Sequence, residues 1–119
     1  MIKKMDIINE QFNNTFLQFL SELERIFPDS PARKTRIQFN LSKLVNNKPP
    51  ITIFCENIQG HGDAIMSKAE DYFFKMDLEF VEYLELEKYY KMSNKETRDI
   101  IWQYIQTLYY LSSSYHKNC

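Results

Sequence analysis

One short stretch of the chain gathers side chains that can bind a metal ion or transfer a proton. His61 and Asp63 stand two residues apart, and Cys55 and Glu56 come shortly before them. Imidazole, thiolate and carboxylate groups are the usual zinc ligands, and a histidine beside a carboxylate can act as an acid or a base. The spacing matches no zinc pattern, however, and the other histidine, His116, stands near the C-terminus. We therefore expect a loop histidine here, with no metal and no cofactor.

Neighbouring carboxylates are the second feature that could carry chemistry. Glu70 and Asp71 are adjacent, and Glu79 and Glu82 are about one helical turn apart. Paired carboxylates act as acid and base in hydrolases when their pKa values are driven apart, but the wet faces of helices carry such pairs routinely. The sequence also has no glycine-rich phosphate loop, no nucleophile elbow and no Walker-type lysine. These residues predict a protein that is not an enzyme.

Aromatic side chains are unusually frequent, with nine Phe, eight Tyr and one Trp among 119 residues. Tyrosine and tryptophan are favoured at protein–protein contacts, because the ring is buried while its polar group stays hydrated. The alternative is that the same rings pack in the protein's own core. Tyr83 is one such residue, and the main candidates for contact with a protein partner are Trp102, Tyr109, Tyr110, Tyr89 and Tyr90.

Charged residues are segregated along the chain, although the net charge is only −1. Residues 70–87 contain seven acidic residues against the single Lys75, whereas residues 30–55 contain five basic residues and no acid. The two segments can be water-facing surfaces or can face each other. Each can also be a docking surface, the basic one for phosphate or an acidic protein. The basic candidates are Arg33, Lys34, Arg36, Lys43 and Lys48.

The composition favours one all-α domain spanning residues 1–119. A chain of this length supports one hydrophobic core, and two Gly and four Pro leave little material for the turns of an all-β fold. No apolar run is long enough for a membrane span and the N-terminus has no signal-peptide pattern, so we expect no membrane insertion. In a cytoplasm-like setting Cys55 and Cys119 are expected as free thiols, with a Cys55–Cys119 bridge as the alternative.

The stretch Ser93–Tyr115 predicts the central helix of the fold. Ser93 and Glu96 have the spacing of a capping box, in which each side chain binds a backbone N–H of the first turn. Apolar and aromatic residues then recur at steps of three and four and spill beyond one face, as in a helix buried among others. The recurring positions are Thr97, Ile101, Tyr104, Ile105, Leu108, Leu111, Ser112 and Tyr115.

The remaining chain predicts further helices, giving a compact bundle of about five or six. Asp6 is expected to cap a helix that ends near Phe27, and Pro31 opens a second helix that ends near Asn46. The inward positions of the first helix are Ile8, Phe12, Phe16, Phe19, Leu20, Leu23 and Ile26. Those of the second are Ile37, Leu41, Leu44 and Val45, with Phe39 as a further position.

The middle of the chain reads as short helices separated by turns. A helix opened by Pro50 is favoured over a strand, because a lone strand would have no partner in this chain. Gly60 can end that helix. Asp63 is expected to cap a short helix, and Asp77 is expected to cap another that runs on to Tyr89.

Three apolar and aromatic stretches carry a resemblance to a known family. They are residues 16–29, which end in Phe27-Pro28-Asp29, then Ile65–Phe74 and Ile101–Leu108. In these stretches the chain resembles small, predominantly helical proteins encoded by nucleocytoplasmic large DNA viruses, the giant viruses of protists and algae. The resemblance implies expression in the cytoplasm or virus factory of an infected cell, with packaging into the virion as a further expectation. It carries over no catalytic residue.

Two functions follow as hypotheses. The first is a non-enzymatic interaction or structural protein, such as a capsid-associated component or an adaptor. It binds a protein partner through its aromatic and charged surfaces. That partner is a viral protein in the setting that the resemblance implies, or a second copy of this chain. The alternative is a nucleic-acid-associated accessory factor of viral transcription or genome packaging, which uses the basic segment of residues 33–48 on phosphates.

Overall fold

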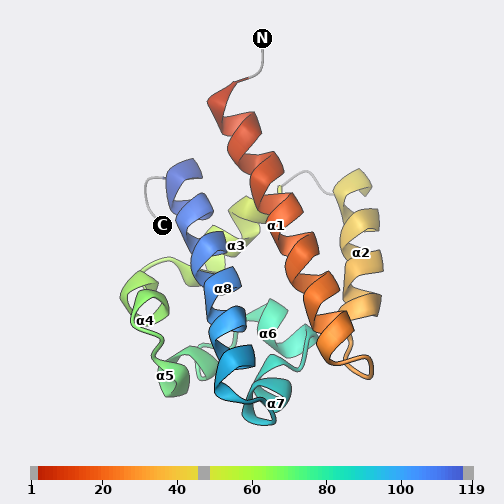
Figure 1. Cartoon of the computed structure of the whole chain (residues 1–119). Coiled ribbons are helices and arrows are strands. Elements are labelled where there is room, and N and C mark those ends of the chain that lie inside the picture. Colours follow the sequence, from red (N-terminus) through yellow and green to blue (C-terminus); the bar gives the residue numbers. More distant parts are fainter. Residues whose placement is uncertain (1–2, 46–48, 117–119) are drawn as a thin grey trace.

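The computed structural model describes residues 3–45 and 49–116, with the side chains of residues 41–45 left aside (Figure 1). The described residues form eight helices and no strand. The all-α prediction is therefore confirmed, with more helices than the five or six expected. Among these residues no helix has both the length and the apolar character to cross a membrane. The helices are α1 (Lys4–Ile26), α2 (Ala32–Val45), α3 (Pro50–Ile58), α4 (Gly62–Met66), α5 (Glu70–Phe74), α6 (Glu79–Tyr83), α7 (Leu86–Lys91) and α8 (Lys95–Tyr115).

The two longest helices, α1 and α8, lie side by side at the centre and run in opposite directions (Figure 1). Helix α8 also contacts α3, α4 and α7, so the predicted central position of the C-terminal helix is confirmed. Every apolar position expected to face inward on α1 is buried except Ile26, which is half-buried. Helix α8 likewise buries Ile101, Ile105 and Leu108. Buried side chains from all eight helices form one cluster.

The N-terminus of α8 is capped by a different residue from the one predicted. Asn94 is the N-cap, and its side-chain oxygen accepts a hydrogen bond of 2.9 Å from the backbone N–H of Thr97. The Ser93 hydroxyl instead donates to the Tyr89 carbonyl at 2.6 Å. The predicted Ser93–Glu96 capping box is therefore wrong. Asparagine and serine cap helices about equally well, so two neighbouring candidates cannot be ranked by type alone.

One predicted inward position of helix α2 faces outward. Ile37 is 47% exposed, whereas Ala32 is buried and Phe39 is half-buried against the core. The predicted inward position of Ile37 is therefore wrong. The side chains of Leu41, Leu44 and Val45, which were also expected inside, lie outside the described residues.

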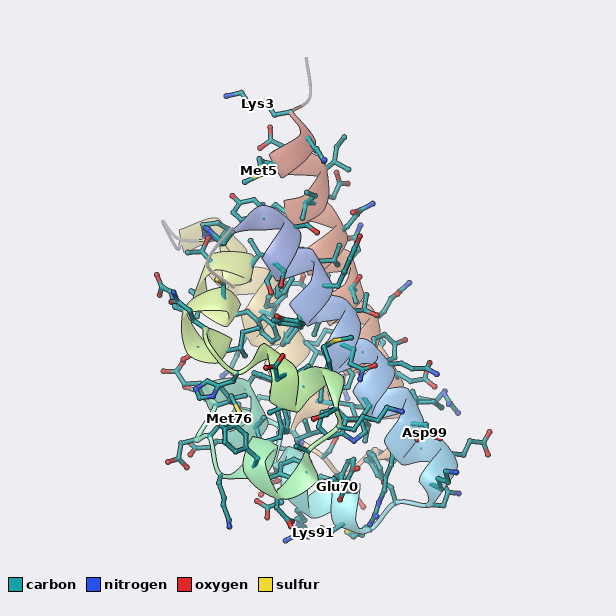
Figure 2. All side chains as sticks on the ribbon, turned by 90° about the vertical axis from the view of Figure 1, so that its left-hand side faces the viewer. Lys3, Met5, Glu70, Met76, Lys91 and Asp99 are labelled. Atoms are coloured by element: carbon teal, nitrogen blue, oxygen red, sulfur yellow. The ribbon has the colours of Figure 1, made fainter. Side chains whose placement is uncertain are left out.

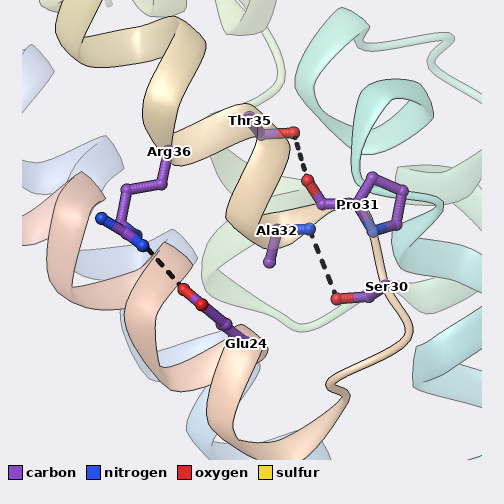
Figure 3. A network of polar contacts seen from close by, with 6 residues as sticks. All are labelled: Glu24, Ser30, Pro31, Ala32, Thr35 and Arg36. Carbon is purple, nitrogen blue, oxygen red and sulfur yellow. Dashed lines mark hydrogen bonds and ion pairs between the residues drawn. The ribbon is translucent and has the colours of Figure 1, made fainter.

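The first turn of α2 is held by polar contacts that orient the helix on α1 (Figure 3). The Ser30 hydroxyl accepts from the Ala32 N–H at 3.4 Å, and the Thr35 hydroxyl donates to the Pro31 carbonyl at 2.9 Å. The Arg36 Nε lies 3.2 Å from Oε2 of Glu24 on α1. This contact between neighbouring helices turns Arg36 toward α1.

Helix α3 has the predicted helical conformation, with Pro50 at its first position. Gly60 follows its end with φ +84°, the left-handed conformation expected where glycine ends a helix. Ile51, Phe54 and Ile58 are buried, at the three- and four-residue steps of one helical face. Cys55 is buried and disulfide-bonded, so the expected free thiol at Cys55 is wrong, and Cys119 lies outside the described residues.

Residues 59–92 are divided into four short helices, where fewer and longer ones were expected. Lys68, Asp77 and Glu85 have φ between +51° and +57°, and each lies between two of the helices. Such a residue interrupts the helical path, because the left-handed conformation reverses the chain locally. The helix predicted from Asp77 to Tyr89 is therefore wrong, since it is broken at Glu85.

The three predicted aspartate caps are also wrong. Asp6 and Asp63 lie inside the first turns of α1 and α4, where a negative charge still favours the helix N-terminus. The observed N-cap residues are Lys3 for α1, His61 for α4 and Leu78 for α6, none of which makes a side-chain cap hydrogen bond.

Replacing Asn94 tests the observed cap. Asn94→Ala should lower the free energy of unfolding by about 1 kcal/mol, because the Thr97 N–H loses its acceptor. Glu96→Ala is the comparison, since it removes the carboxylate that a capping box would use, while the observed cap would lose only a favourable charge near the helix N-terminus. Urea denaturation followed by circular dichroism measures both changes, and a larger loss for Glu96→Ala than for Asn94→Ala would favour the capping box over the observed cap.

Candidate protein-binding groove

Four helices leave a cavity of about 360 Å³ between them, which we call the aromatic groove. Helices α1, α2, α3 and α6 each supply part of its wall, and half of its lining residues are Phe or Tyr. A concave site with apolar walls and a few polar groups is the usual form of a binding site. Its lining residues are Phe12, Phe16, Thr35, Gln38, Phe39, Pro50, Ile53, Phe54, Asn57, Glu79, Phe80 and Tyr83.

The floor of the aromatic groove is a set of rings in mutual contact. The Phe12 and Phe54 rings lie 5.4 Å apart, and Phe16 lies 4.9 Å from Phe39. Phe54 also lies 5.5 Å from Phe80, measured between ring centroids. These separations are those of favourable aromatic pairs, so the floor is held in place by packing before any ligand arrives.

The rim of the aromatic groove has neutral polar groups on α2 and α3, and a carboxylate and a tyrosine ring on α6. Thr35 and Gln38 of α2 and Asn57 of α3 supply neutral groups, whereas Glu79 of α6 is the one charged residue among the lining residues. Tyr83, also on α6, is 63% exposed. The groove therefore offers apolar walls beside a single negative charge, with a tyrosine ring standing in water at its edge.

Helix α6 is short because of the residues on either side of it. Asp77, with φ +55°, precedes it, and Glu85, with φ +51°, follows it. Its inward residue Val81 is buried and Phe80 is half-buried, so α6 is anchored by one side while Glu79 and Tyr83 remain at the groove. The geometry of this wall follows from two backbone conformations that the sequence pattern did not reveal.

Three of the five aromatic residues predicted to contact a partner lie in the core. Trp102 and Tyr90 are each 2% exposed, and the indole N–H of Trp102 donates to the Tyr90 hydroxyl at 2.8 Å. Tyr89 is also buried, with its ring 5.0 Å from that of Phe27. For these three the structure has the alternative arrangement, in which the rings pack inside the protein.

The other two predicted aromatics, Tyr109 and Tyr110, lie on α8 and differ in exposure. Tyr110 is 68% exposed. Tyr109 is half-buried, and its hydroxyl lies so close to Gly62 that a Cβ there would come within 2.0 Å of it. Neither residue lines the aromatic groove. Tyr110 remains a candidate contact, and it is also a natural control because its exposure matches that of Tyr83.

The five predicted basic residues do not form one described surface. Arg33 and Lys34 are exposed at the start of α2, whereas Arg36 is half-buried and pairs with Glu24 (Figure 3). The side chains of Lys43 and Lys48 lie outside the described residues.

The acidic segment borders a separate cleft of about 460 Å³ between α5, α6 and α7. Asp77, Glu82, Glu85 and Glu87 line it together with two lysines, and Lys91 Nζ lies 2.8 Å from Oε1 of Glu87. Part of the acidic charge is therefore balanced locally.

The cluster around His61 does not assemble into one site. The His61 Nδ1 lies 2.7 Å from the Tyr72 hydroxyl in a shared hydrogen bond, while Asp63 is exposed and Cys55 is buried. Among the residues that the structure describes, no group of three or more histidine, cysteine, aspartate or glutamate side chains could hold a metal ion.

The sequence pointed to several of the groove residues but not to the groove itself. The apolar periodicity predicted Phe12 and Phe16 as inward positions, and Tyr83 was recognised as an amphipathic ring. No periodicity tells where four packed helices leave space between them. Comparison with protein-family models, with curated proteins and with solved structures found no match to this chain. The groove must therefore be interpreted from its own residues.

The buried Tyr90 hydroxyl gives a test of the core. Burial raises the pKa of Tyr90 above its ordinary value of 10.0, the Trp102 N–H lowers it in part, and the carboxylate of Glu70 raises it further. The folded state therefore holds the Tyr90 proton more tightly than the unfolded state. The stability that this proton contributes is present below about pH 10 and is lost as the pH rises through the folded pKa.

We expect the stability advantage of the wild type over Tyr90→Phe to shrink as the pH rises from about 9 to about 11.5. Urea denaturation of both proteins at each pH measures the difference between their free energies of unfolding. Groups other than Tyr90 titrate in both proteins, so their contributions cancel in this difference. Tyr110→Phe is the control, because Tyr110 is exposed. A difference for Tyr90→Phe that stays constant across this range would contradict the assignment.

Proposed function

We propose that this chain is a non-enzymatic protein-binding module, an adaptor or structural component that takes a partner into its aromatic groove. The observation that carries the proposal is the groove itself, in which packed rings form the floor and the 63% exposed Tyr83 forms the edge. Aromatic side chains at an open cavity are the usual energetic centre of protein–protein contacts. When a partner covers this exposed tyrosine ring, apolar surface is removed from water and the free energy of the complex falls.

The chemistry of the groove indicates the kind of partner segment that fits. The apolar walls suit an aliphatic or aromatic anchor, and Glu79 suits an arginine or lysine next to that anchor. Residues 70–87 carry further acidic side chains around α6, which favours the approach of a basic segment. We therefore propose a partner segment with a large apolar residue beside a positive charge.

The structural observations favour this proposal over nucleic-acid binding. Phosphate binding draws on several cations that act together. Of the basic residues whose side chains are described in α2, Arg36 is engaged with Glu24, which leaves Arg33 and Lys34 exposed. The setting of an infected cell and its virus factory is proposed on the viral resemblance alone.

Selection of peptides tests the proposal without knowledge of the natural partner. Random peptides of about 16 residues displayed on phage are selected against the whole chain, and the dissociation constants of the enriched peptides are measured by fluorescence anisotropy. We expect enriched sequences with an apolar anchor next to arginine or lysine. Tyr83→Ala should weaken their binding at least about tenfold, because the ring at the groove edge is lost.

Two further variants make the result specific to the groove. Gln38→Trp places a large side chain at the exposed rim and should block binding, while Tyr110→Ala removes a ring of similar exposure elsewhere and should leave the affinity unchanged. Enriched peptides that bind Gln38→Trp as well as the wild type, or no enrichment of any groove-dependent peptide, would contradict the proposal.

A further inference from the structure

The N-terminal end of α1 projects beyond the helices that cover the rest of it. Figure 2 shows Lys3 and Met5 past the end of the bundle. Met5 is 41% exposed and Ile7 is 45% exposed, whereas Ile8 is 7% exposed. We call residues 3–7 the α1 overhang. The neighbouring helices therefore begin to cover α1 within about one helical turn after these residues.

The apolar stripe of α1 continues into the overhang. Met5 precedes Ile8 by three residues and Phe12 by seven, which places the three side chains on one face of the helix. Ile8 and Phe12 use that face to pack in the core, but Met5 has no comparable cover. The overhang also carries Lys3 and Lys4, both exposed, against the single acid Asp6. It is thus a short helical segment with an apolar residue beside positive charge.

We propose that the α1 overhang of one copy docks into the aromatic groove of a second copy of this chain. The inference rests on the proposed function of the groove and names its occupant. Met5 is unbranched and flexible, so it can fit between the rings of the groove. Lys3 or Lys4 then lies toward Glu79, the charged residue of the lining. The overhang thus offers an apolar side chain for the apolar walls of the groove and a positive charge for its carboxylate.

The overhang cannot fill the groove of its own chain. Phe12 and Phe16 line the groove and lie on the same continuous helix as Met5. At 1.5 Å per residue, Met5 lies about 10 Å along the helix axis from Phe12, and it cannot turn back without breaking α1. A second copy has no such restriction. Because overhang and groove share α1, two copies related by a two-fold axis can exchange overhangs, and each contact then supports the other.

The contact is small, so the association should be weak. A few side chains from each overhang bury much less surface than a standard stable interface. We therefore expect a dissociation constant on the order of 10 µM. Sedimentation velocity of the whole chain from about 1 to 300 µM should show the mass rising from 14.4 kDa toward twice that value.

Variants of both surfaces should weaken this association. Met5→Glu and Tyr83→Ala should each raise the dissociation constant at least tenfold, while Tyr110→Ala should leave it unchanged. Both changes are at exposed positions, and circular dichroism checks that the helices persist. A chain that stays monomeric at 300 µM, or an association that neither variant weakens, would overturn the inference.

An exchange of charges tests the docking without removing any apolar contact. A Lys3→Glu/Lys4→Glu chain carries an acidic overhang and the native acidic groove, and a Glu79→Lys chain has a basic overhang and a basic groove. Each should associate poorly alone. In a mixture both contacts become complementary, so we expect a mixed dimer near the wild-type affinity. A mixture no stronger than either variant alone would count against the assigned pairing.

The outcomes separate this inference from the proposed function. If peptides selected from the library bind the groove but the chain remains monomeric, the groove is a binding site for another protein and the self-association is wrong. If neither occurs, both proposals fail. Sedimentation velocity of the whole Gln38→Trp chain links the two proposals, because a blocked groove should abolish the self-association as well as the binding of selected peptides.

Discussion

The packing of α1 against α8 is the contact on which the rest of the structure depends. These helices are long enough to bury several turns each, and they meet through rings such as Phe19 and Tyr104, whose centroids lie 5.2 Å apart. Helices α4 to α7 have five or six residues each, which is too short for a helix to be stable alone. Helices α4 and α7 pack directly on α8, and all four short helices join the same buried cluster through residues such as Ile65, Phe73 and Leu86.

This dependence explains why the sequence predicted the fold class and the long helices well. The stripes on α1 and α8 repeat over five or more turns, so the helical period is unmistakable. In α2 the apolar residues after Arg33 follow the helical period less clearly. The pattern predicted Ile37 as an inward residue, whereas Phe39 packs against the core and Ile37 is exposed. Short apolar runs cannot fix which face of a helix meets its neighbour, because that depends on where the neighbour lies.

The helix boundaries and the aromatic groove could not be predicted from the sequence, for a different reason. Asn94 and Ser93 are both good caps, and only the path of the chain decides between them. Lys68 and Glu85 are not residue types that mark a left-handed turn, and aspartate such as Asp77 adopts that conformation far less often than glycine. The breaks between α4, α5, α6 and α7 therefore carry no strong local signal. The aromatic groove then depends on where α6 lies, which follows from two of those breaks.

The left-handed residues have a consequence for motion in this part of the molecule. A non-glycine residue held in that conformation stores about 1 kcal/mol of backbone strain, which is released when the surrounding turn opens. Opening α6 breaks few helical hydrogen bonds and frees two such residues, Asp77 and Glu85. The amides of α6 should therefore exchange with solvent through local fluctuations far smaller than global unfolding, while those of the covered turns of α1 and α8 should exchange only with the whole fold. The aromatic groove therefore has a compliant wall in α6, so a bound side chain larger than the resting cavity can be admitted by displacing that short helix.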